Sequence, residues 1–151
     1  MECVTVSSIT EQQRKELFKG NNLYYYNGVS KVIQIDDNII GFYTPHFLFD
    51  RLTIEFNLFE QYRHHGLGYT FVNMVTEMVG KEYPDYDSIF LFIRSDNFSS
   101  LTVALQNGYT QVYNEELQQM VEEEMSNYFI YYKKNEFYKN PVKSKQLLHK
   151  I

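Results

Sequence analysis

The stretch that most constrains the fold is residues 52–79, where a predicted strand leads through a glycine-containing loop into a predicted helix. Residues 52–59 alternate apolar and polar side chains at their start and are rich in β-forming residues, which is typical of a strand. Residues 69–79 repeat apolar side chains at the spacing of one helical face, and Gly80 is expected to end this helix. The loop is therefore expected at the amino-terminal end of the helix.

This loop carries Gly66 and Gly68 shortly after Arg63. Glycine lets backbone come close to a ligand, and the free N–H groups and dipole of a helix start favour an anion. A Rossmann turn would need a third glycine and a downstream acidic residue, and a P-loop would need Gly-Lys-Ser/Thr, so neither pattern fits. The alternative is a helix start with two turn glycines and no ligand.

A continuous apolar run, residues 88–94, follows the helix and suits a strand that is buried on both faces. With residues 52–59 it predicts a β–α–β unit, whose two strands are parallel because a helix joins them. Upstream, residues 31–35 and 39–43 predict a hairpin, because Asp-Asp-Asn between them favours a turn. Pro45 predicts a bend or bulge, since proline cannot serve a central ladder.

A second pattern follows the apolar run. Asn97 and Ser100 provide capping groups for a short helix, Gly108 ends it, and Tyr109 starts a further strand. The two patterns together resemble motifs of the GNAT superfamily of N-acetyltransferases. In that family the first is Arg or Gln, two residues, Gly, one residue, then Gly or Ala, and the second is Asn, two residues, Ser or Ala, then Gly-Phe or Gly-Tyr closing the helix. The resemblance is firm over residues 52–113 and looser outside them.

The resemblance implies an α/β (α+β) fold with a mixed, mostly antiparallel sheet of six to seven strands, a central β–α–β unit and helices on both faces. Residues 1–134 would form a single acetyltransferase domain, and residues 135–151 would be a basic tail, docked or mobile. Ser100 together with an alanine at position 104 points to the ribosomal-protein N-terminal acetyltransferase branch.

Other segments are assigned from local pattern. Residues 3–6 and 127–133 predict a first and a last strand, and residues 118–125 predict a loop or a short helix. Residues 10–18 begin with a capping box and predict a helix. The tyrosines at positions 24–26 either pack the edge of the core or form a wall of an acceptor pocket.

The resemblance further implies that the protein uses acetyl-CoA as a co-substrate and transfers its acetyl group to a primary amine of a small molecule or peptide. The loop would hold the pyrophosphate, and the strand before it would pair with the pantetheine arm and polarise the thioester carbonyl through a backbone N–H. The residues expected to bind acetyl-CoA are Leu58, Phe59, Arg63, His64, His65, Gly66, Leu67, Gly68, Tyr69, Asn97 and Ser100.

Catalysis needs a base, because an alkyl amine is protonated at neutral pH. Glu55 is the only carboxylate within the strand of residues 52–59 and is the candidate; the alternative is an ordinary carboxylate at a sheet edge. Many relatives have a tyrosine as general acid where this chain has Ala104, so Ser100 or another tyrosine would take that role. Cys3 lies at the far amino terminus, so direct attack within a ternary complex is expected.

Composition narrows the class of protein. The chain has 151 residues and is 44% hydrophobic, which suits one globular domain. No apolar run spans a membrane, the amino terminus does not resemble a signal peptide, and the single cysteine fits a reducing cytoplasm. His46 and His149 stand isolated, there is no zinc-ligand spacing, and no metal is expected.

Charge is unevenly distributed along the chain. Residues 1–132 hold 8 Lys or Arg and 18 Asp or Glu, a net of −10, whereas residues 133–151 hold 6 Lys and 1 Glu, a net of +5. The acidic body argues against nucleic-acid binding and favours a cationic acceptor. We expect a monomer or homodimer. Two other functions stay open: a protein that binds acyl-CoA with little catalysis, and a scaffold that uses the acidic face or basic tail.

Overall fold

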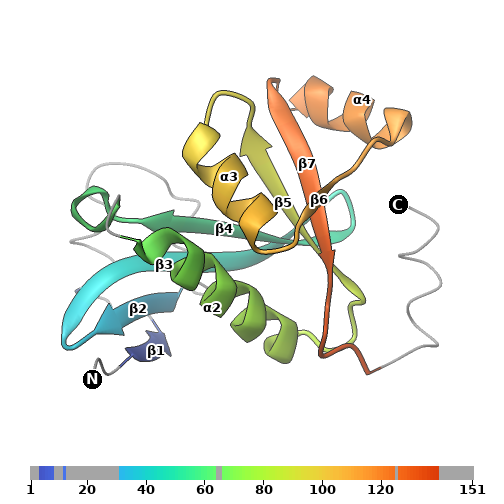
Figure 1. Ribbon diagram of the computed structural model, residues 1–151. Coiled ribbons are helices and arrows are strands. Elements are labelled where there is room, and N and C mark those ends of the chain that lie inside the picture. The colour runs from blue at the N-terminus through green and yellow to red at the C-terminus, as the bar shows by residue number, and fades with distance from the viewer. Residues whose placement is uncertain (1–3, 9–11, 13–30, 64–65, 125, 140–151) are drawn as a thin grey trace.

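The structure is a computed structural model that describes residues 4–8, 12, 31–63, 66–124 and 126–139 (Figure 1). Its strands are β1 (Val4–Ser8), β2 (Lys31–Ile35), β3 (Asn38–Leu48), β4 (Arg51–Leu58), β5 (Ser88–Arg94), β6 (Thr110–Gln111) and β7 (Tyr128–Lys134). Its helical elements are η2 (Glu60–Tyr62), α2 (Leu67–Glu82), α3 (Phe98–Gln106) and α4 (Glu115–Glu124). The helix and the tyrosine cluster expected within residues 10–26 lie outside the described residues, apart from residue 12.

The strands form one seven-stranded sheet in the order β1-β2-β3-β4-β5-β7-β6. Only β4 and β5 are parallel among the described strands, and α2 joins them as the crossover of the predicted β–α–β unit. The remaining neighbours are antiparallel, so the expected mixed, mostly antiparallel sheet is confirmed. The last strand pairs with the strand near Tyr109, as expected, and also with β5.

Helices cover both faces of the sheet. On one face α2 and α3 lie side by side and bury the main core, in which Leu52, Ile54, Val75, Leu91 and Ala104 take part (Figure 1). The opposite face carries a second core, in which Phe90 and Ile130 of the sheet pack against Leu117 and Val121 of α4. These two helical residues are four apart, which explains why a segment so rich in glutamate folds as a helix.

The hairpin between β2 and β3 turns at Asp36 and Asp37, with φ of 49° and 70°. Two successive positive φ values are the signature of a type I′ turn, whose twist matches that of the strands. The bend expected at Pro45 is wrong, because β3 continues through it, opposite Ile54 of β4. Proline lacks an N–H group and cannot donate to a neighbouring strand. The described part of β2 starts at Lys31, opposite Tyr43, so no described residue of β2 lies opposite Pro45 to need that donor.

The sequence predicted that Gly80 ends α2. This prediction is wrong, because the helix continues to Glu82. A Cβ atom at Gly80 would lie 2.5 Å from Oδ1 of Asn135, so the glycine is required for close packing. The Asn135 side-chain amide donates to the carbonyl oxygens of Gly80, Tyr83 and Tyr86 at 2.9–3.1 Å. The start of the expected basic tail is therefore docked onto the end of α2.

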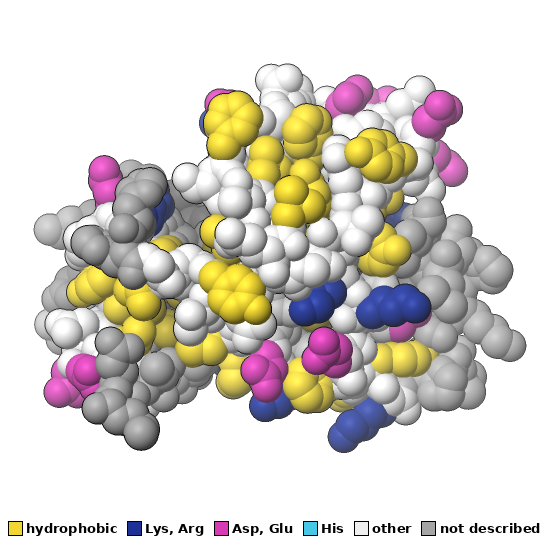
Figure 2. Space-filling model, in the orientation of Figure 1, with side chains coloured by type: hydrophobic (Ala, Val, Ile, Leu, Met, Phe, Trp, Pro, Cys, Tyr) yellow, Lys and Arg dark blue, Asp and Glu magenta, His cyan; other side chains and the backbone are white. Residues whose placement is uncertain are grey.

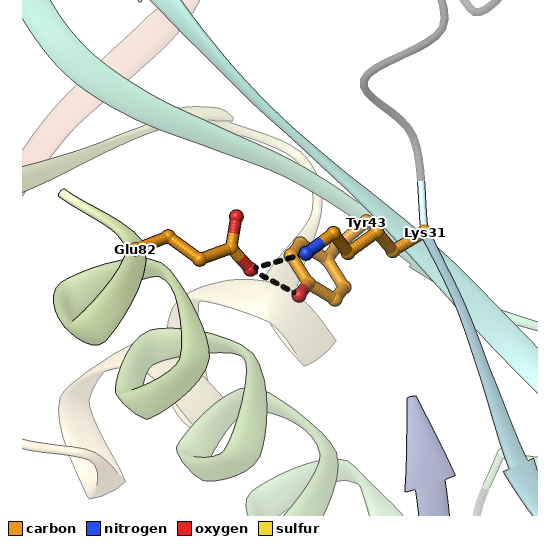
Figure 3. A network of polar contacts seen from close by, with 3 residues as sticks. All are labelled: Lys31, Tyr43 and Glu82. Atoms are coloured by element: carbon orange, nitrogen blue, oxygen red, sulfur yellow. Dashed lines mark hydrogen bonds and ion pairs between the residues drawn. The ribbon is translucent and has the colours of Figure 1, made fainter. Parts of the chain in front are cut away.

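The carboxyl-terminal end of α2 is fastened to the hairpin by a polar network (Figure 3). Lys31 and Tyr43 are cross-strand partners on β2 and β3, and both contact Oε1 of Glu82, at 3.0 and 2.9 Å. A carboxylate at the negative end of a helix dipole is unfavourable by itself, and the ammonium and phenol groups offset that cost. Among the described residues no helix is both long and apolar enough to cross a membrane.

Candidate functional site

A groove of about 930 Å³ opens where β4 ends and where α2 and α3 begin. Both helices follow the carboxyl ends of the parallel strands, and such ends are where open α/β sheets bind their ligands. The described residues that line the groove are Phe56, Asn57, Leu58, Arg63, Gly66, Gly68, Tyr69, Phe71, Val72, Asn97, Phe98, Ser99, Ser100, Thr102, Val103 and Gln106. Both sequence motifs therefore meet at one site.

The two parallel strands diverge at this groove. β4 and β5 pair at a single register position, Thr53 opposite Phe90, although both strands continue beyond it. Phe59 donates its N–H to the carbonyl oxygen of Ile40 at 2.9 Å, on the side of β3. Because successive residues of a strand direct their N–H groups to opposite sides, the N–H of Leu58 is directed towards the β5 side. Of Leu58 and Phe59, the two residues at the end of this strand that were expected to bind acetyl-CoA, Leu58 is the one whose N–H is directed to the groove.

Arg63 holds the end of β4 and the loop together. Its Nε donates to the carbonyl oxygen of Leu58 at 2.6 Å, and an Nη atom donates to Oδ1 of Asn57 at 3.1 Å. It is the single charged side chain among the described residues that line the groove. The guanidinium thus provides a positive charge next to the backbone of Leu58, in a position to contact an anionic ligand.

The two motif glycines serve different purposes. Gly66 precedes α2 with φ of 77°, and a Cβ atom there would meet nothing within 4 Å, so it needs its left-handed backbone and faces open space. Gly68 lies in the first turn, where a Cβ atom would approach Cγ2 of Val103 to 3.3 Å. It allows α2 and α3 to pack closely. The first turn of α2, all of it described, contains no acidic side chain.

The start of α3 forms the other side of the groove. Asn97 caps the helix by accepting a hydrogen bond from the Ser100 N–H at 3.2 Å, which gives this motif asparagine a structural role. Ser99 and Ser100 add hydroxyl groups to the lining. Asn107, at the far end of α3, donates to the carbonyl oxygen of Tyr69 at 3.4 Å and so connects the two helices.

Glu55 does not line the groove. It lies opposite Thr44 in the β3–β4 ladder, on the sheet face away from α2 and α3. Its Oε2 atom is shielded from solvent. Glu55 and Ser100 thus belong to opposite faces of the sheet, near the place where β4 and β5 separate.

Ala104 is fully buried in the main core and is not part of the groove lining. His64 and His65 lie outside the described residues, as do Cys3 and His149. His46 is half-buried on β3, and burial lowers its pKa below the usual 6.5. Among the described residues no three His, Cys, Asp or Glu side chains are placed to bind a metal ion together.

Several lining residues were not expected from the sequence. Phe56, Phe71 and Val72 belong to the apolar patterns of β4 and α2, which indicate a core and give no sign of a groove. Phe98 directly follows the predicted cap Asn97, and this position beside the motif is its one signal in the sequence. On the face seen in Figure 2, acidic side chains gather over α4, whereas apolar and uncharged side chains predominate over α3.

No protein-family model and no curated protein sequence matches the chain. Solved structures do. A Bacillus subtilis acetyltransferase in complex with CoA aligns at 13% identity with a TM-score of 0.64, over 89% of this chain and 99% of that one. The Campylobacter jejuni N-acetyltransferase PseH in complex with acetyl coenzyme A aligns at 12% identity with a TM-score of 0.62, over 87% and 99%.

The Escherichia coli ribosomal-protein-S18-alanine N-acetyltransferase aligns at 11% identity with a TM-score of 0.62, over 88% of this chain and 94% of that one. These likenesses extend over nearly the whole length of each chain. The chain therefore has the fold of the GNAT N-acetyltransferases, as the two motifs had predicted.

Proposed function

We propose that the protein is an N-acetyltransferase that moves an acetyl group from acetyl-CoA to a primary amine by direct attack in a ternary complex. The observation that carries this proposal is the groove itself. It joins a divergent parallel strand pair, the open backbone at Gly66 and the guanidinium of Arg63 at the start of one helix. The fold shared with acetyltransferases solved with CoA and acetyl-CoA supports it.

In this proposal the loop and the first turn of α2 bind the pyrophosphate. The N–H groups of Leu67, Gly68 and Tyr69 belong to that first turn. No carbonyl group of the helix precedes them to accept their hydrogen bonds, so they are available to an anion. Arg63 adds positive charge at the same place. His64 and His65, which lie between Arg63 and Gly66 in the sequence, belong to the same proposed binding loop. Asn97 and Ser100 complete the binding set from the start of α3.

Leu58 polarises the thioester in this scheme. Its N–H is directed to the space that opens between β4 and β5, and a fixed backbone donor stabilises the negative charge that develops on a carbonyl oxygen under attack. Arg63 holds the Leu58 carbonyl, and Phe59 is fixed to Ile40, so the donor is positioned from both sides. Ser100 is the candidate acid for the departing thiolate.

Glu55 would accept the proton of the amine from the opposite sheet face. A base on that face implies that the acceptor approaches there, across the sheet from the helices that hold the co-substrate. The acidic balance of residues 1–132 would favour a cationic amine, and added salt should then lower kcat/KM. A preferred acceptor that is neutral or anionic would contradict this part of the proposal.

The decisive binding experiment compares two matched glycines. Gly66 and Gly108 both have positive φ, 77° and 85°, and an added Cβ meets nothing closer than 3.6 Å at either. Alanine at either site should cost about 1–2 kcal/mol of stability through the left-handed backbone. Gly66→Ala should weaken CoA binding in calorimetry, and Gly108→Ala should not. Failure of the parent protein to bind CoA at millimolar concentration would refute the proposal.

A second function is favoured by Ala104, the position at which many relatives have a tyrosine acid. Under this alternative the protein binds acyl-CoA and turns it over poorly. A screen of acetyl-CoA consumption over polyamines, aminoglycosides and peptide amino termini separates the two. Tight CoA binding with no acceptor above background would favour the alternative.

A further inference from the structure

Phe98 is the first residue of α3, and its side chain is 73% exposed although it lines the groove. An aromatic side chain presents a large apolar surface, and leaving it in water forgoes the stabilisation that burial would give. The helix does not need this ring, because Asn97 provides the cap. An exposed phenyl ring within a groove is a contact surface for a flat, apolar part of a ligand.

Tyr69 provides a second ring at the same groove. It belongs to the first turn of α2, and its side chain is 48% exposed. Its carbonyl oxygen accepts a hydrogen bond from the Asn107 side chain, so its backbone is held while the ring remains at the groove. Two aromatic side chains from the starts of two helices thus flank the place where the proposed function puts the pyrophosphate.

The order of groups in coenzyme A decides which part of it reaches these rings. The pyrophosphate lies between the pantetheine arm and the adenosine. If the start of α2 binds the pyrophosphate and β4 pairs with the pantetheine, the adenosine must extend away from β4, towards the solvent edge of the groove. Phe98 is the most exposed of the large apolar residues that line the groove, which marks that edge.

We infer that Phe98, with Tyr69, forms the adenine-binding wall of the groove, and that the phenyl ring of Phe98 stacks on the base. This inference rests on the proposed function and deepens it, because it assigns a residue to the nucleoside end of the co-substrate. Removal of an aromatic ring that stacks on a base typically lowers affinity by about 5- to 150-fold. Stacking depends on the aromatic face and requires no hydrogen bond, so another aromatic side chain at position 98 should preserve the affinity for the base.

The test is calorimetry of the whole chain with CoA and with 4′-phosphopantetheine, which lacks the adenosine together with its 3′-phosphate and one phosphate of the pyrophosphate. Phe98→Ala should weaken CoA binding by about 5- to 150-fold and leave phosphopantetheine binding within about twofold. Phe98→Tyr keeps a ring and should stay within about threefold of the parent for CoA. Leu105→Ala is the matched control, because Leu105 is 56% exposed on the same helix and does not line the groove.

The outcomes separate the two proposals. A parent protein that does not bind CoA refutes the proposed function. If the parent binds CoA and Phe98→Ala binds it within twofold, the assignment of Phe98 is wrong. It is also wrong if Phe98→Ala weakens both ligands equally, or if Phe98→Tyr is as weak as the alanine variant, because the effect would then come from helix placement. A thermal melt of each variant confirms that it is folded.

Discussion

The hydroxyl group of Tyr43 donates a hydrogen bond of 2.9 Å to the carboxylate of Glu82, across the interface between the sheet and α2. The phenol is fully buried, and Lys31 shares the same carboxylate oxygen. Burial raises the pKa of Tyr43 above its ordinary value of 10.0, and the nearby Glu82 carboxylate raises it further. The neutral phenol is thus a requirement of the folded state.

Stability should therefore fall in alkaline solution. Because the pKa of Tyr43 is raised in the folded protein, its contribution is fully present below about pH 10 and is lost as the pH rises above it, where only the unfolded phenol ionises. Tyr43→Phe should reduce this loss by up to about 1.4 kcal/mol per pH unit. Urea unfolding at several values between pH 8 and pH 11.5 measures it.

At neutral pH the same variant should be less stable than the parent by about 1–3 kcal/mol, because it leaves Glu82 without one hydrogen bond to its charge. Tyr113→Phe is the control. Its ring is 86% exposed and its hydroxyl donates to Gln111 at the surface, so its loss should change stability by less than about 0.5 kcal/mol. Equal alkaline slopes for Tyr43→Phe and the parent would contradict the role of this buried phenol.

Gly68→Val should disturb both the fold and the groove. Even the first added carbon would stand 3.3 Å from Val103, so the larger side chain must push α3 away from α2. We expect lower stability and weaker CoA binding together. Adding Val103→Ala to this variant should restore part of the lost stability and part of the lost CoA affinity, with a coupling energy of about 0.5–3 kcal/mol in a double-mutant cycle. Strict additivity would show that the contact does not matter.

Ala104→Tyr should not install the missing acid. The alanine side chain is fully buried in the main core, to which Phe71, Val75 and Tyr109 also belong, so a phenol has no room. We expect a loss of about 3 kcal/mol or more and no gain in turnover. Leu105→Tyr, the neighbouring exposed position, should cost less than about 1 kcal/mol. A stable Ala104→Tyr enzyme with a higher rate would show that the helix can make space.

Glu55→Gln should lower turnover on the order of 100-fold and leave CoA affinity unchanged, because it removes the proposed base, whose side chain lies outside the groove. The acidic limb of the pH–rate profile should change with it. The control is Glu77→Gln, an exposed carboxylate paired with Lys81 on α2. Should Glu55→Gln retain the parent rate at every pH, the base is another group or a chain of water molecules.

The β–α–β unit and both motifs were predictable because each depends on local chemistry. Apolar periodicity distinguishes a strand from a helix, and the positions of Gly66 and Asn97 mark where a helix starts. The two motifs are some thirty residues apart in the chain, and only the parallel pairing of β4 and β5 brings them to one groove. That pairing follows from the crossover connection.

The two wrong predictions, at Gly80 and Pro45, concern residues whose role depends on segments that are distant in the sequence. Gly80 was expected to end a helix, yet it is glycine because Asn135 packs against it. Pro45 was expected to bend a strand, yet β3 stays regular there. The described part of the neighbouring strand β2 does not extend to a position opposite Pro45, so no described residue of β2 lacks an N–H donor there. No window of local sequence contains either fact. The divergence of β4 from β5, which creates the groove, likewise depends on how whole strands pack.

The docking of Asn135 also fixes where the chain can be cut or fused. Its side-chain amide serves three carbonyl oxygens, and beyond it Lys139 donates its N–H to the carbonyl oxygen of Pro84. Trimming the chain after residue 134, the last of the expected domain, would leave three carbonyls without their donor and open a cavity beside Gly80. A shortened version for crystallisation should therefore keep residues up to 139, and a fusion partner should be joined after that residue.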